Sequence, residues 1–181
     1  MKIMVIVAHP NFSTSRANQA FVQELKEQEH ADIAVRNLYQ EYPNWHIDVE
    51  KEQQLLLAYD RIVFQFPFYW YSCPPLLKKW FDDVLTFGWA FGPGGDHLKG
   101  KEFMVVTTTG GTENGYRSGG DNGFTISELL RPIQNTITKC NGTYLPVFVT
   151  YNVTNSTEAR LSSEAKRYAA FIQSSMVALV H

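Results

Sequence analysis

Residues 9–18, which read HPNFSTSRAN, combine hydroxyl and amide side chains with the expected start of a helix. Backbone N–H groups and the helix dipole at such a start favour an anion, and the Ser15 hydroxyl and the Asn18 amide would add neutral donors. The segment holds neither the Gly-Lys-Ser/Thr of a Walker loop nor the dinucleotide pattern G-x-G-x-x-G. We interpret it as a neutral phosphate cradle, which suits a ligand that stays bound; an ordinary capping run is the alternative.

A second segment, residues 66–75, reads FPFYWYSCPP and concentrates aromatic side chains. Core packing explains Phe66. It does not bury the next four aromatics together, because consecutive side chains point in different directions: Phe68, Tyr69, Trp70 and Tyr71. An aromatic wall beside exposed turn backbone suits a flat heteroaromatic ring that needs stacking and N–H donors. An aromatic turn packed in the core is the alternative.

A third segment, residues 107–123, reads TTTGGTENGYRSGGDNG and contains six glycines from Gly110 onward. Glycine lets the backbone approach a ligand closely and leaves its N–H groups free to donate. The segment therefore indicates a second source of backbone donors, with a merely flexible loop as the alternative.

The elements that must position these segments alternate along the chain. Apolar or alternating stretches predict five strands, at residues 3–8, 33–37, 61–66, 102–108 and 143–149. Capping residues and apolar periodicity predict helices that begin after residues 13–15 and at Asp48, Pro74, Thr125 and Thr157. Thr125 and Glu128 match a capping box, and Pro132 is expected to kink the helix that follows.

This alternation indicates an α/β fold: a doubly wound five-stranded parallel sheet with helices on both faces. Polar alternation in residues 33–37 and Pro146 in residues 143–149 place those strands at the edges, which fits the strand order 2-1-3-4-5. In that topology the ligand crevice lies beyond the C-terminal ends of strands one and three. The three segments follow strands one, three and four, so we expect them to meet there, within one domain spanning residues 1–181.

Composition excludes several other classes of protein. The 181 residues include 16 Lys and Arg against 18 Asp and Glu, so the chain lacks the basic surface that binds nucleic acid or an anionic membrane. No apolar run reaches the roughly 18 residues of a membrane span, and no secretion signal is present, so we expect a cytoplasmic location. Two cysteines, Cys73 and Cys140, cannot form a metal cluster, and no metal is expected.

Read in register, the three segments resemble the flavodoxin-like NAD(P)H:quinone oxidoreductases. The matching residues are His9-Pro10 with Ser15-Arg16-Ala17-Asn18, residues 68–78 (FYWYSCPPLLK) and Thr108-Thr109-Gly110-Gly111. The resemblance runs from residue 3 to about residue 150. It is closest to short bacterial members, which include ancillary proteins of glutathione-regulated potassium-efflux systems, and it implies a flavodoxin-like fold.

The resemblance implies a flavin site made by all three segments. The residues implied to hold the flavin phosphate are His9, Ser15, Arg16, Ala17 and Asn18. Those implied to lie against the isoalloxazine ring are Phe68, Tyr69, Trp70 and Tyr71. Those implied to face its pyrimidine edge are Thr108, Thr109, Gly110 and Gly111. The short chain, like the short members, implies FMN, with FAD as the alternative.

The resemblance also implies a catalytic tyrosine, which corresponds to Tyr116; a packed loop aromatic is the alternative. Some members place a histidine about six residues beyond that tyrosine, whereas this chain has Asp121 and Asn122. A tyrosine–histidine proton relay is therefore not carried over. Residues 92–97, which end in His97, resemble the family's loop that borders the nicotinamide site.

The implied activity is that of an NAD(P)H dehydrogenase (quinone): two-electron, ping-pong hydride transfer from NADH or NADPH through FMN to a quinone-type acceptor. Azoreductase or nitroreductase activity would differ only in the acceptor. An electron-carrier flavodoxin is less favoured, because such carriers usually display a strongly acidic face and the net charge here is -2. A regulatory subunit of a potassium-efflux transporter, held at the inner face of the membrane, is a further alternative.

A homodimer is also expected. Residues 66–71 and 89–91 would expose more apolar surface than a small monomer usually tolerates, and the resemblance points the same way. We expect each active site to be completed near the partner chain.

Overall fold

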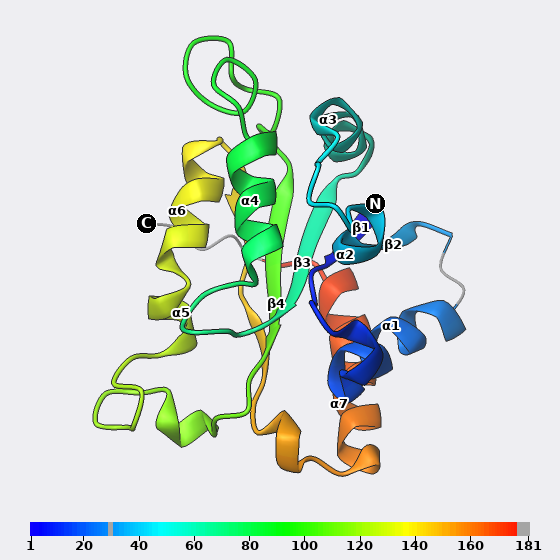
Figure 1. Ribbon diagram of the computed structural model, residues 1–181, viewed down its shortest axis with the longest axis vertical. Helices are drawn as coiled ribbons and strands as arrows, with labels where there is room; N and C mark the ends of the chain where they lie inside the picture. Colours follow the sequence, from blue (N-terminus) through cyan, green and yellow to red (C-terminus); the bar gives the residue numbers. More distant parts are fainter. Residues whose placement is uncertain (29–30, 177–181) are drawn as a thin grey trace.

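The computed structural model describes residues 1–28 and 31–176, which form a parallel sheet between two layers of helices (Figure 1). The strands are β1 (Ile3–Val7), β2 (Ile33–Asn37), β3 (Arg61–Pro67), β4 (Glu102–Thr108), β5 (Thr143–Tyr144) and β6 (Phe148–Thr150). All strand pairs are parallel, in the order β2-β1-β3-β4-β5, with β6 also paired to β4. The predicted α/β class and strand order are confirmed.

The predicted fifth strand is divided in two. β5 ends at Tyr144 and β6 begins at Phe148, so a continuous strand over residues 143–149 is wrong. The Leu145 N–H still donates to the Phe103 carbonyl at 2.8 Å, but Pro146 has no N–H with which to continue the ladder. Among the described strands, β5 and β6 pair with β4 alone, which confirms the edge position.

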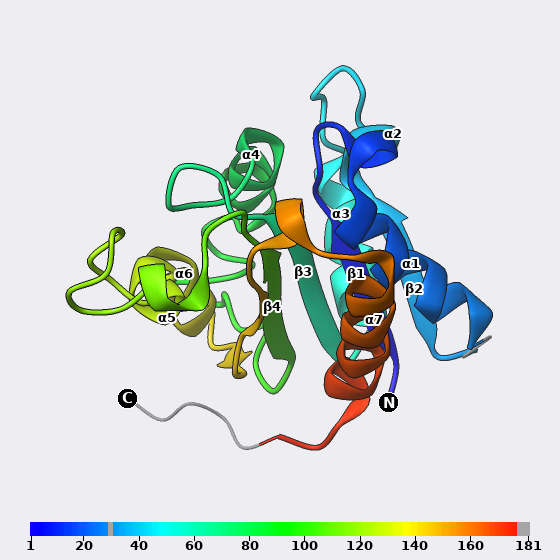
Figure 2. The ribbon, with the colours of Figure 1, turned by 90° about the horizontal axis from the view of Figure 1, so that it is seen from below.

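Helices cover both faces of the sheet, because alternate residues of each buried strand point to opposite sides. On one face α1 (Arg16–Glu27) and α7 (Glu158–Gln173) pack on Ile3, Val5 and Val7 (Figure 2). On the other, α3 (Val49–Ala58), α4 (Pro75–Val84) and α6 (Arg131–Lys139) pack around Met4 and Ile6. Within residues 1–28 and 31–176, no helix combines the length and apolar character needed to cross a bilayer.

Short helical pieces connect the main elements: α2 (Leu38–Glu41), α5 (Ile126–Leu129) and the 3₁₀ turns η1 (Phe12–Thr14), η2 (Glu113–Gly115) and η3 (Val153–Asn155). The capping box of Thr125 and Glu128 is confirmed. The single helix kinked at Pro132 is wrong, because α5 ends at Leu129 and α6 begins at Arg131. Pro132 lies in the first turn of α6, where its missing N–H removes no helical hydrogen bond.

A buried carboxylate holds α4 in place behind the aromatic segment. Glu52 is fully buried and pairs with Arg36. It also accepts hydrogen bonds from the Tyr42 hydroxyl at 2.6 Å and from Trp80 Nε1 at 2.8 Å. A buried charge is tolerated when it is paired and hydrogen-bonded in this way. Because Trp80 belongs to α4, the cluster fixes the helix that begins directly after residues 66–74.

Since the strands are parallel, the C-terminal ends of β1, β3 and β4 lie at one edge of the sheet, at the bottom of Figure 1. The connections that leave this edge contain the three segments singled out by residue type. An open α/β sheet binds its ligands in the crevice at this edge.

Candidate functional site

Hydrogen bonds join the three segments at the C-terminal edge of the sheet. Asn18 Nδ2 donates to Thr108 Oγ1 at 3.2 Å, and the Phe68 N–H donates to the Thr108 carbonyl at 2.8 Å. The Tyr71 hydroxyl donates to Asn122 Oδ1 at 3.3 Å. The predicted convergence of the segments is therefore present in the structure.

The start of α1 presents unsatisfied donors. Ser15 is the N-cap residue, but its side chain makes no capping hydrogen bond. The N–H groups of Arg16, Ala17 and Asn18 have no acceptor within the helix, and none elsewhere in the described ranges. These donors lie at the positive end of the helix dipole, which favours an anion.

Asn18 is not the free donor that its residue type indicates. Its side chain is buried, and its Nδ2 donates to Ser15 Oγ at 3.0 Å as well as to Thr108. Both amide hydrogens are thus used within the protein. Because Ser15 Oγ accepts one of them, the Ser15 hydroxyl hydrogen is left to donate elsewhere. Asn18 therefore orients Ser15, and its own backbone N–H is the group left for an anion.

The charge of the Arg16 side chain is paired outside the proposed phosphate cradle. Its Nε and Nη2 donate to Glu158 Oε1 at 2.8 and 2.5 Å, and Nη2 also donates to the Ser156 carbonyl at 2.9 Å. The guanidinium thus joins α1 to the start of α7 and already has a carboxylate partner. Ala17 is buried and has no polar side-chain atom, so the two residues offer backbone N–H groups to the crevice.

His9 adds a neutral ring beside the cradle. Its Nδ1 accepts from the Asn11 N–H at 3.1 Å, which places the ring hydrogen on Nε2 in the neutral form. Burial lowers the pKa of His9, so the imidazole is neutral at pH 7. The ring meets Tyr69 edge-on, with centroids 6.1 Å apart. His9 thus presents one neutral N–H donor and joins the first segment to the second.

The aromatic segment forms a strained turn with its tip in solvent. Tyr69 and Ser72 exchange two backbone hydrogen bonds, of 3.1 and 3.0 Å. Between them, Trp70 and Tyr71 have φ of 47° and 62°, a region that bulky residues rarely adopt and that costs about 1–3 kcal/mol each. Trp70 is 93% exposed, and Phe68 alone of the four aromatics is buried. The turn presents aromatic surface at the C-terminal edge of the sheet, as an aromatic wall requires.

The Thr-Gly-Gly segment offers fewer donors than expected. Thr108 and Thr109 are buried, and Gly111 donates its N–H to Thr109 Oγ1 at 3.1 Å. In the part of the chain that the structure describes, the Gly110 N–H has no partner, and Gly110 is exposed. Gly110 therefore has the backbone N–H of this segment that is left to donate, whereas the Gly111 N–H already has a partner within the protein.

Tyr116 contacts the aromatic segment, the Thr-Gly-Gly segment and Tyr151. Its ring meets Phe68 edge-on at 5.8 Å and Tyr151 at 6.0 Å. A Cβ at Gly111 would lie 2.8 Å from the Tyr116 ring, so the glycine makes room for the tyrosine. The Tyr116 hydroxyl lies 3.0 Å from Thr109 Oγ1. Where some family members carry a histidine, Asp121 is exposed and Asn122 accepts from Tyr71 instead.

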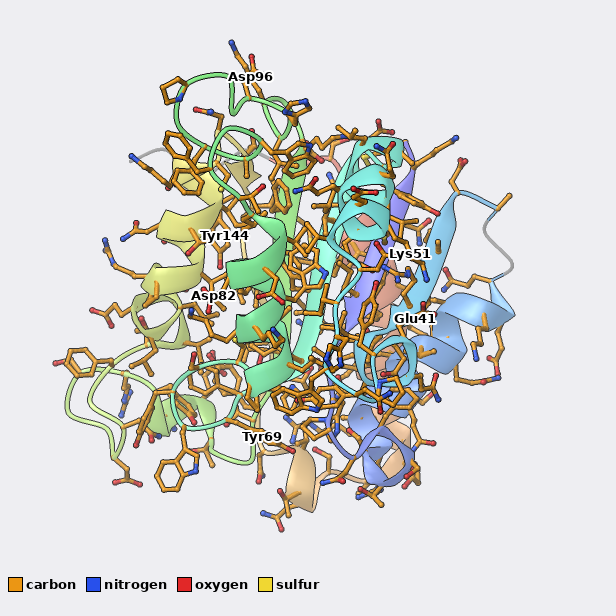
Figure 3. All side chains as sticks on the ribbon, turned by 45° about the horizontal axis from the view of Figure 1, so that its top comes forward. Glu41, Lys51, Tyr69, Asp82, Asp96 and Tyr144 are labelled. Atoms are coloured by element: carbon orange, nitrogen blue, oxygen red, sulfur yellow. The ribbon has the colours of Figure 1, made fainter. Side chains whose placement is uncertain are left out.

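The loop that contains His97 does not reach this crevice. It connects α4 to the N-terminal end of β4, so it lies at the opposite edge of the sheet. Figure 3 shows Asp96 of this loop and Tyr69 of the aromatic turn at opposite ends of the molecule. His97 stacks on Trp89 there, with centroids 5.2 Å apart. Within one chain, His97 therefore lies away from the edge where the three segments meet.

Gln65 supports the candidate site, although no sequence motif indicates it. It is fully buried in β3, donates to Asn18 Oδ1 at 3.1 Å and accepts from the Tyr168 hydroxyl at 2.9 Å. It therefore holds the side chain that orients Ser15. The available signal was a single amide within the otherwise apolar run IVFQF of residues 62–66, because a buried polar side chain needs partners.

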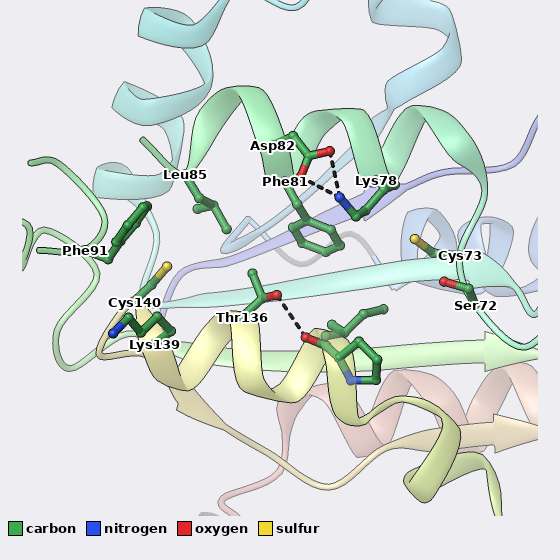
Figure 4. Close-up of a pocket in the computed structure, with 12 residues that line it drawn as sticks. Ser72, Cys73, Lys78, Phe81, Asp82, Leu85, Phe91, Thr136, Lys139 and Cys140 are labelled. Carbon is green, nitrogen blue, oxygen red and sulfur yellow. Dashed lines mark hydrogen bonds and ion pairs between the residues drawn. The ribbon is translucent and has the colours of Figure 1, made fainter. Parts of the chain in front are cut away.

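An apolar groove of about 380 Å³ lies apart from the crevice, between α4 and α6 (Figure 4). Its lining includes Phe81, Leu85 and Ile133, and both cysteines, Cys73 and Cys140. Burial raises the pKa of both thiols. None of the residues predicted to hold a ligand lines this groove. Among the described residues, no group of three or more His, Cys, Asp or Glu is placed to hold a metal.

Known sequences match the chain over nearly its whole length. The flavodoxin-like fold family matches residues 1–172. General stress protein 14 of Bacillus subtilis (strain 168) is 52% identical over 98% of this chain and 100% of that protein. An uncharacterized NAD(P)H oxidoreductase of the same organism, YrkL, is 49% identical over 96% and 98%. KefG of Yersinia enterocolitica, a potassium-efflux system ancillary protein, is 40% identical over 96% and 93%.

Three solved structures have nearly the same backbone fold as this chain. General stress protein 14 of Treponema denticola, in complex with FMN, is 37% identical with a TM-score of 0.90 over 95% of this chain and 98% of that one. An NADPH-quinone reductase of P. pentosaceus is 33% identical, with a TM-score of 0.86 over 96% and 98%. A chain described as a tryptophan halogenase of Streptomycin violaceusniger is 49% identical, with a TM-score of 0.92 over 95% and 99%.

These three descriptions differ although the backbone is shared, so the fold alone does not decide the reaction. The family itself follows from the match over residues 1–172 and from the identity to whole relatives. The chain belongs to the flavodoxin-like NAD(P)H oxidoreductase family, close to general stress protein 14 and to KefG.

Proposed function

We propose that this protein is an FMN-dependent NAD(P)H:quinone oxidoreductase. The observation that carries the proposal is one edge of the sheet with three complementary parts: neutral donors at the start of α1, an exposed aromatic turn and a free glycine N–H. A phosphate, a flat ring and the polar edge of that ring need these three kinds of contact. The complex of a 37% identical protein with FMN supports the same cofactor here.

The residues fit FMN in the following way. The backbone N–H groups of residues 16–18, the Ser15 hydroxyl and His9 Nε2 would hold the phosphate. Tyr69, Trp70 and Tyr71 would lie against the ring, with Phe68 packed behind them. The Gly110 N–H would donate to the pyrimidine edge. FAD remains the alternative cofactor.

Bound FMN supplies a group that accepts a hydride from NAD(P)H and returns two electrons to an acceptor. The sum is NAD(P)H, a proton and a quinone giving NAD(P)⁺ and a hydroquinone. The protein binds and orients the reactants and excludes side reactions. The Gly110 N–H would donate to negative charge at the ring edge, a preorganised electrostatic contribution.

Ping-pong kinetics are expected, because the aromatic turn would cover one face of the ring and leave one open face. NAD(P)H and the quinone then use the same space in succession. Initial rates over a grid of NADH or NADPH and 1,4-benzoquinone concentrations should give parallel double-reciprocal lines. Intersecting lines would contradict a shared site. The same assay with an azo dye and a nitroaromatic in place of the quinone compares the alternative acceptors.

A homodimer forms part of the proposal. Trp70 and Phe87 are 93% and 70% exposed, whereas Trp89 and Phe91 are half-buried, so Phe87 is the exposed aromatic of that loop. The loop lies at the far edge of its own sheet and would border a crevice only in a second copy. Light scattering should give about twice the mass of one chain throughout a dilution series. A measured mass equal to that of a single chain at every concentration would contradict the proposed dimer.

A role beside a potassium-efflux transporter is a second candidate, favoured by the 40% identity to KefG over 96% of this chain. Such a role would coexist with the redox activity. If an efflux subunit stays bound to the tagged protein during purification from a detergent extract, this role is supported. Loss of the subunit at every salt concentration would argue against the role.

A further inference from the structure

The Thr109 hydroxyl contacts both the backbone of the Thr-Gly-Gly turn and the hydroxyl of Tyr116. Its Oγ1 accepts from the Gly111 N–H at 3.1 Å and lies 3.0 Å from the Tyr116 oxygen. Its own position is fixed from both sides, because its N–H donates to the Thr150 carbonyl at 3.0 Å and its carbonyl accepts from the Val153 N–H at 3.1 Å. The hydroxyl is therefore held on a rigid part of the sheet edge.

The direction of the hydrogen bond between the two hydroxyls follows from the partners available. Thr109 is 4% exposed, so its hydroxyl hydrogen needs an acceptor inside the protein. Within the described ranges, the Tyr116 oxygen is the acceptor at hydrogen-bond distance. Tyr116 is partly exposed. If Thr109 donates to Tyr116, both hydroxyl hydrogens are satisfied, since the tyrosine hydrogen can reach a bound group or water.

We propose that Thr109 is a positioning residue for Tyr116: it donates to the phenol oxygen, fixes the ring, and directs the hydroxyl hydrogen of the tyrosine toward the group bound in the crevice. The consequence for catalysis rests on the proposed function. This chain has Asp121 and Asn122 where some members of the family have a histidine, and Thr109 takes the place of a partner for the tyrosine. Unlike a histidine, a threonine orients the phenol without exchanging a proton with it.

The packing around Tyr116 supports this role. Gly111 admits the ring against the turn backbone, and Phe68 and Tyr151 contact it from two other elements. Packing thus restricts the plane of the Tyr116 ring. What packing leaves undetermined is the direction of the O–H bond, and the Thr109 hydroxyl fixes that direction. Loss of that hydroxyl should leave the ring near its place and release the hydrogen.

The test uses five variants of the protein as purified with its flavin. Thr109→Val removes the hydroxyl at nearly constant volume, and Thr109→Ser keeps it. Thr107→Val is the matched control, because the Thr107 hydroxyl is also buried in β4 but donates to the Phe66 carbonyl. Tyr116→Phe and the double variant Thr109→Val with Tyr116→Phe complete a cycle. The rate of flavin reduction by NAD(P)H is measured by anaerobic stopped flow.

Thr109→Val should slow reduction roughly 3- to 10-fold, the effect of one hydrogen bond between neutral groups. Thr109→Ser and Thr107→Val should remain within about 2-fold of the unchanged protein. The double variant should be no slower than Tyr116→Phe, because Thr109 acts through the phenol. Slowing of the double variant beyond Tyr116→Phe, or a serine variant as slow as the valine variant, would overturn the proposal.

A second readout is independent of turnover. With ¹³C at the Cζ of tyrosine, the Tyr116 resonance is assigned by its absence in Tyr116→Phe. It should shift in Thr109→Val and stay in place in Thr109→Ser and Thr107→Val. An unmoved resonance in Thr109→Val would show that the hydrogen bond is not made. If neither NADH nor NADPH reduces the unchanged protein, the proposed function fails, while this spectrum still decides the role of Thr109.

Discussion

Replacing Ser15 with alanine is expected to weaken FMN binding about 10- to 100-fold and to destabilise the apoprotein by about 1–3 kcal/mol, because the buried Asn18 amide loses one acceptor. The weaker binding is expected because Ser15 is the N-cap of α1 without making a capping bond. Its oxygen accepts from Asn18 at 3.0 Å, so its hydrogen is free for the phosphate. A hydrogen bond to a charged group contributes about 1.5–3 kcal/mol, and each 1.4 kcal/mol is about tenfold in affinity.

The matched control is Asp48, an N-cap residue whose side chain does make a capping hydrogen bond. Asp48 caps α3 by accepting from the Lys51 N–H at 3.0 Å, so Asp48→Ala should cost about 1 kcal/mol of stability and leave FMN affinity unchanged. Binding is measured by quenching of FMN fluorescence, and stability by urea unfolding of the apoprotein. Equal FMN affinity in Ser15→Ala and the unchanged protein would place the phosphate elsewhere.

Replacing Tyr116 with phenylalanine is expected to slow flavin reduction by at most about 10- to 100-fold, with the flavin still bound. The substitution keeps the ring that packs on Phe68 and Tyr151 and removes the hydroxyl near Thr109. One proton-transfer or hydrogen-bonding contribution accounts for an effect of this size. Hydride transfer needs no general base, so some activity should survive.

Tyr144→Phe is the control for the loss of a buried phenol hydroxyl. Among the described residues, the Tyr144 hydroxyl is the buried side-chain polar group without a hydrogen-bond partner, so its removal should leave the rate unchanged. Stopped-flow bleaching of the flavin absorbance measures both variants. If Tyr116→Phe abolishes bleaching although flavin is retained, the tyrosine has a larger role than its contacts indicate.

The sheet was predictable from the sequence because burial on both faces makes a strand continuously apolar. Residues 3–7 show this pattern, residues 62–66 show it apart from Gln65, and both strands form as expected. The division of the fifth strand was partly predictable, since Pro146 indicated an edge. Predicting two short strands in place of one requires knowing which backbone N–H groups donate to β4. That depends on the register of the strands against β4.

The meeting of three loops at one edge was predictable, because the topology brings them there. The roles of individual polar side chains were not, because their partners are distant in sequence. Asn18 is fixed by Gln65 and Thr108, and Arg16 by Glu158, 142 residues away. The left-handed backbone of Trp70 and Tyr71 was equally hidden, since residues of this size disfavour it.

The most direct test of the proposed activity is an anaerobic titration of the purified protein with NADH and, separately, NADPH, followed by absorbance. The chromophore released by heat should run with FMN in chromatography. One of the two nucleotides should bleach about one flavin per chain without any acceptor present, and 1,4-benzoquinone should then restore the absorbance. A bound flavin that stays oxidised with both nucleotides, or a protein that neither contains nor takes up FMN, would contradict the account.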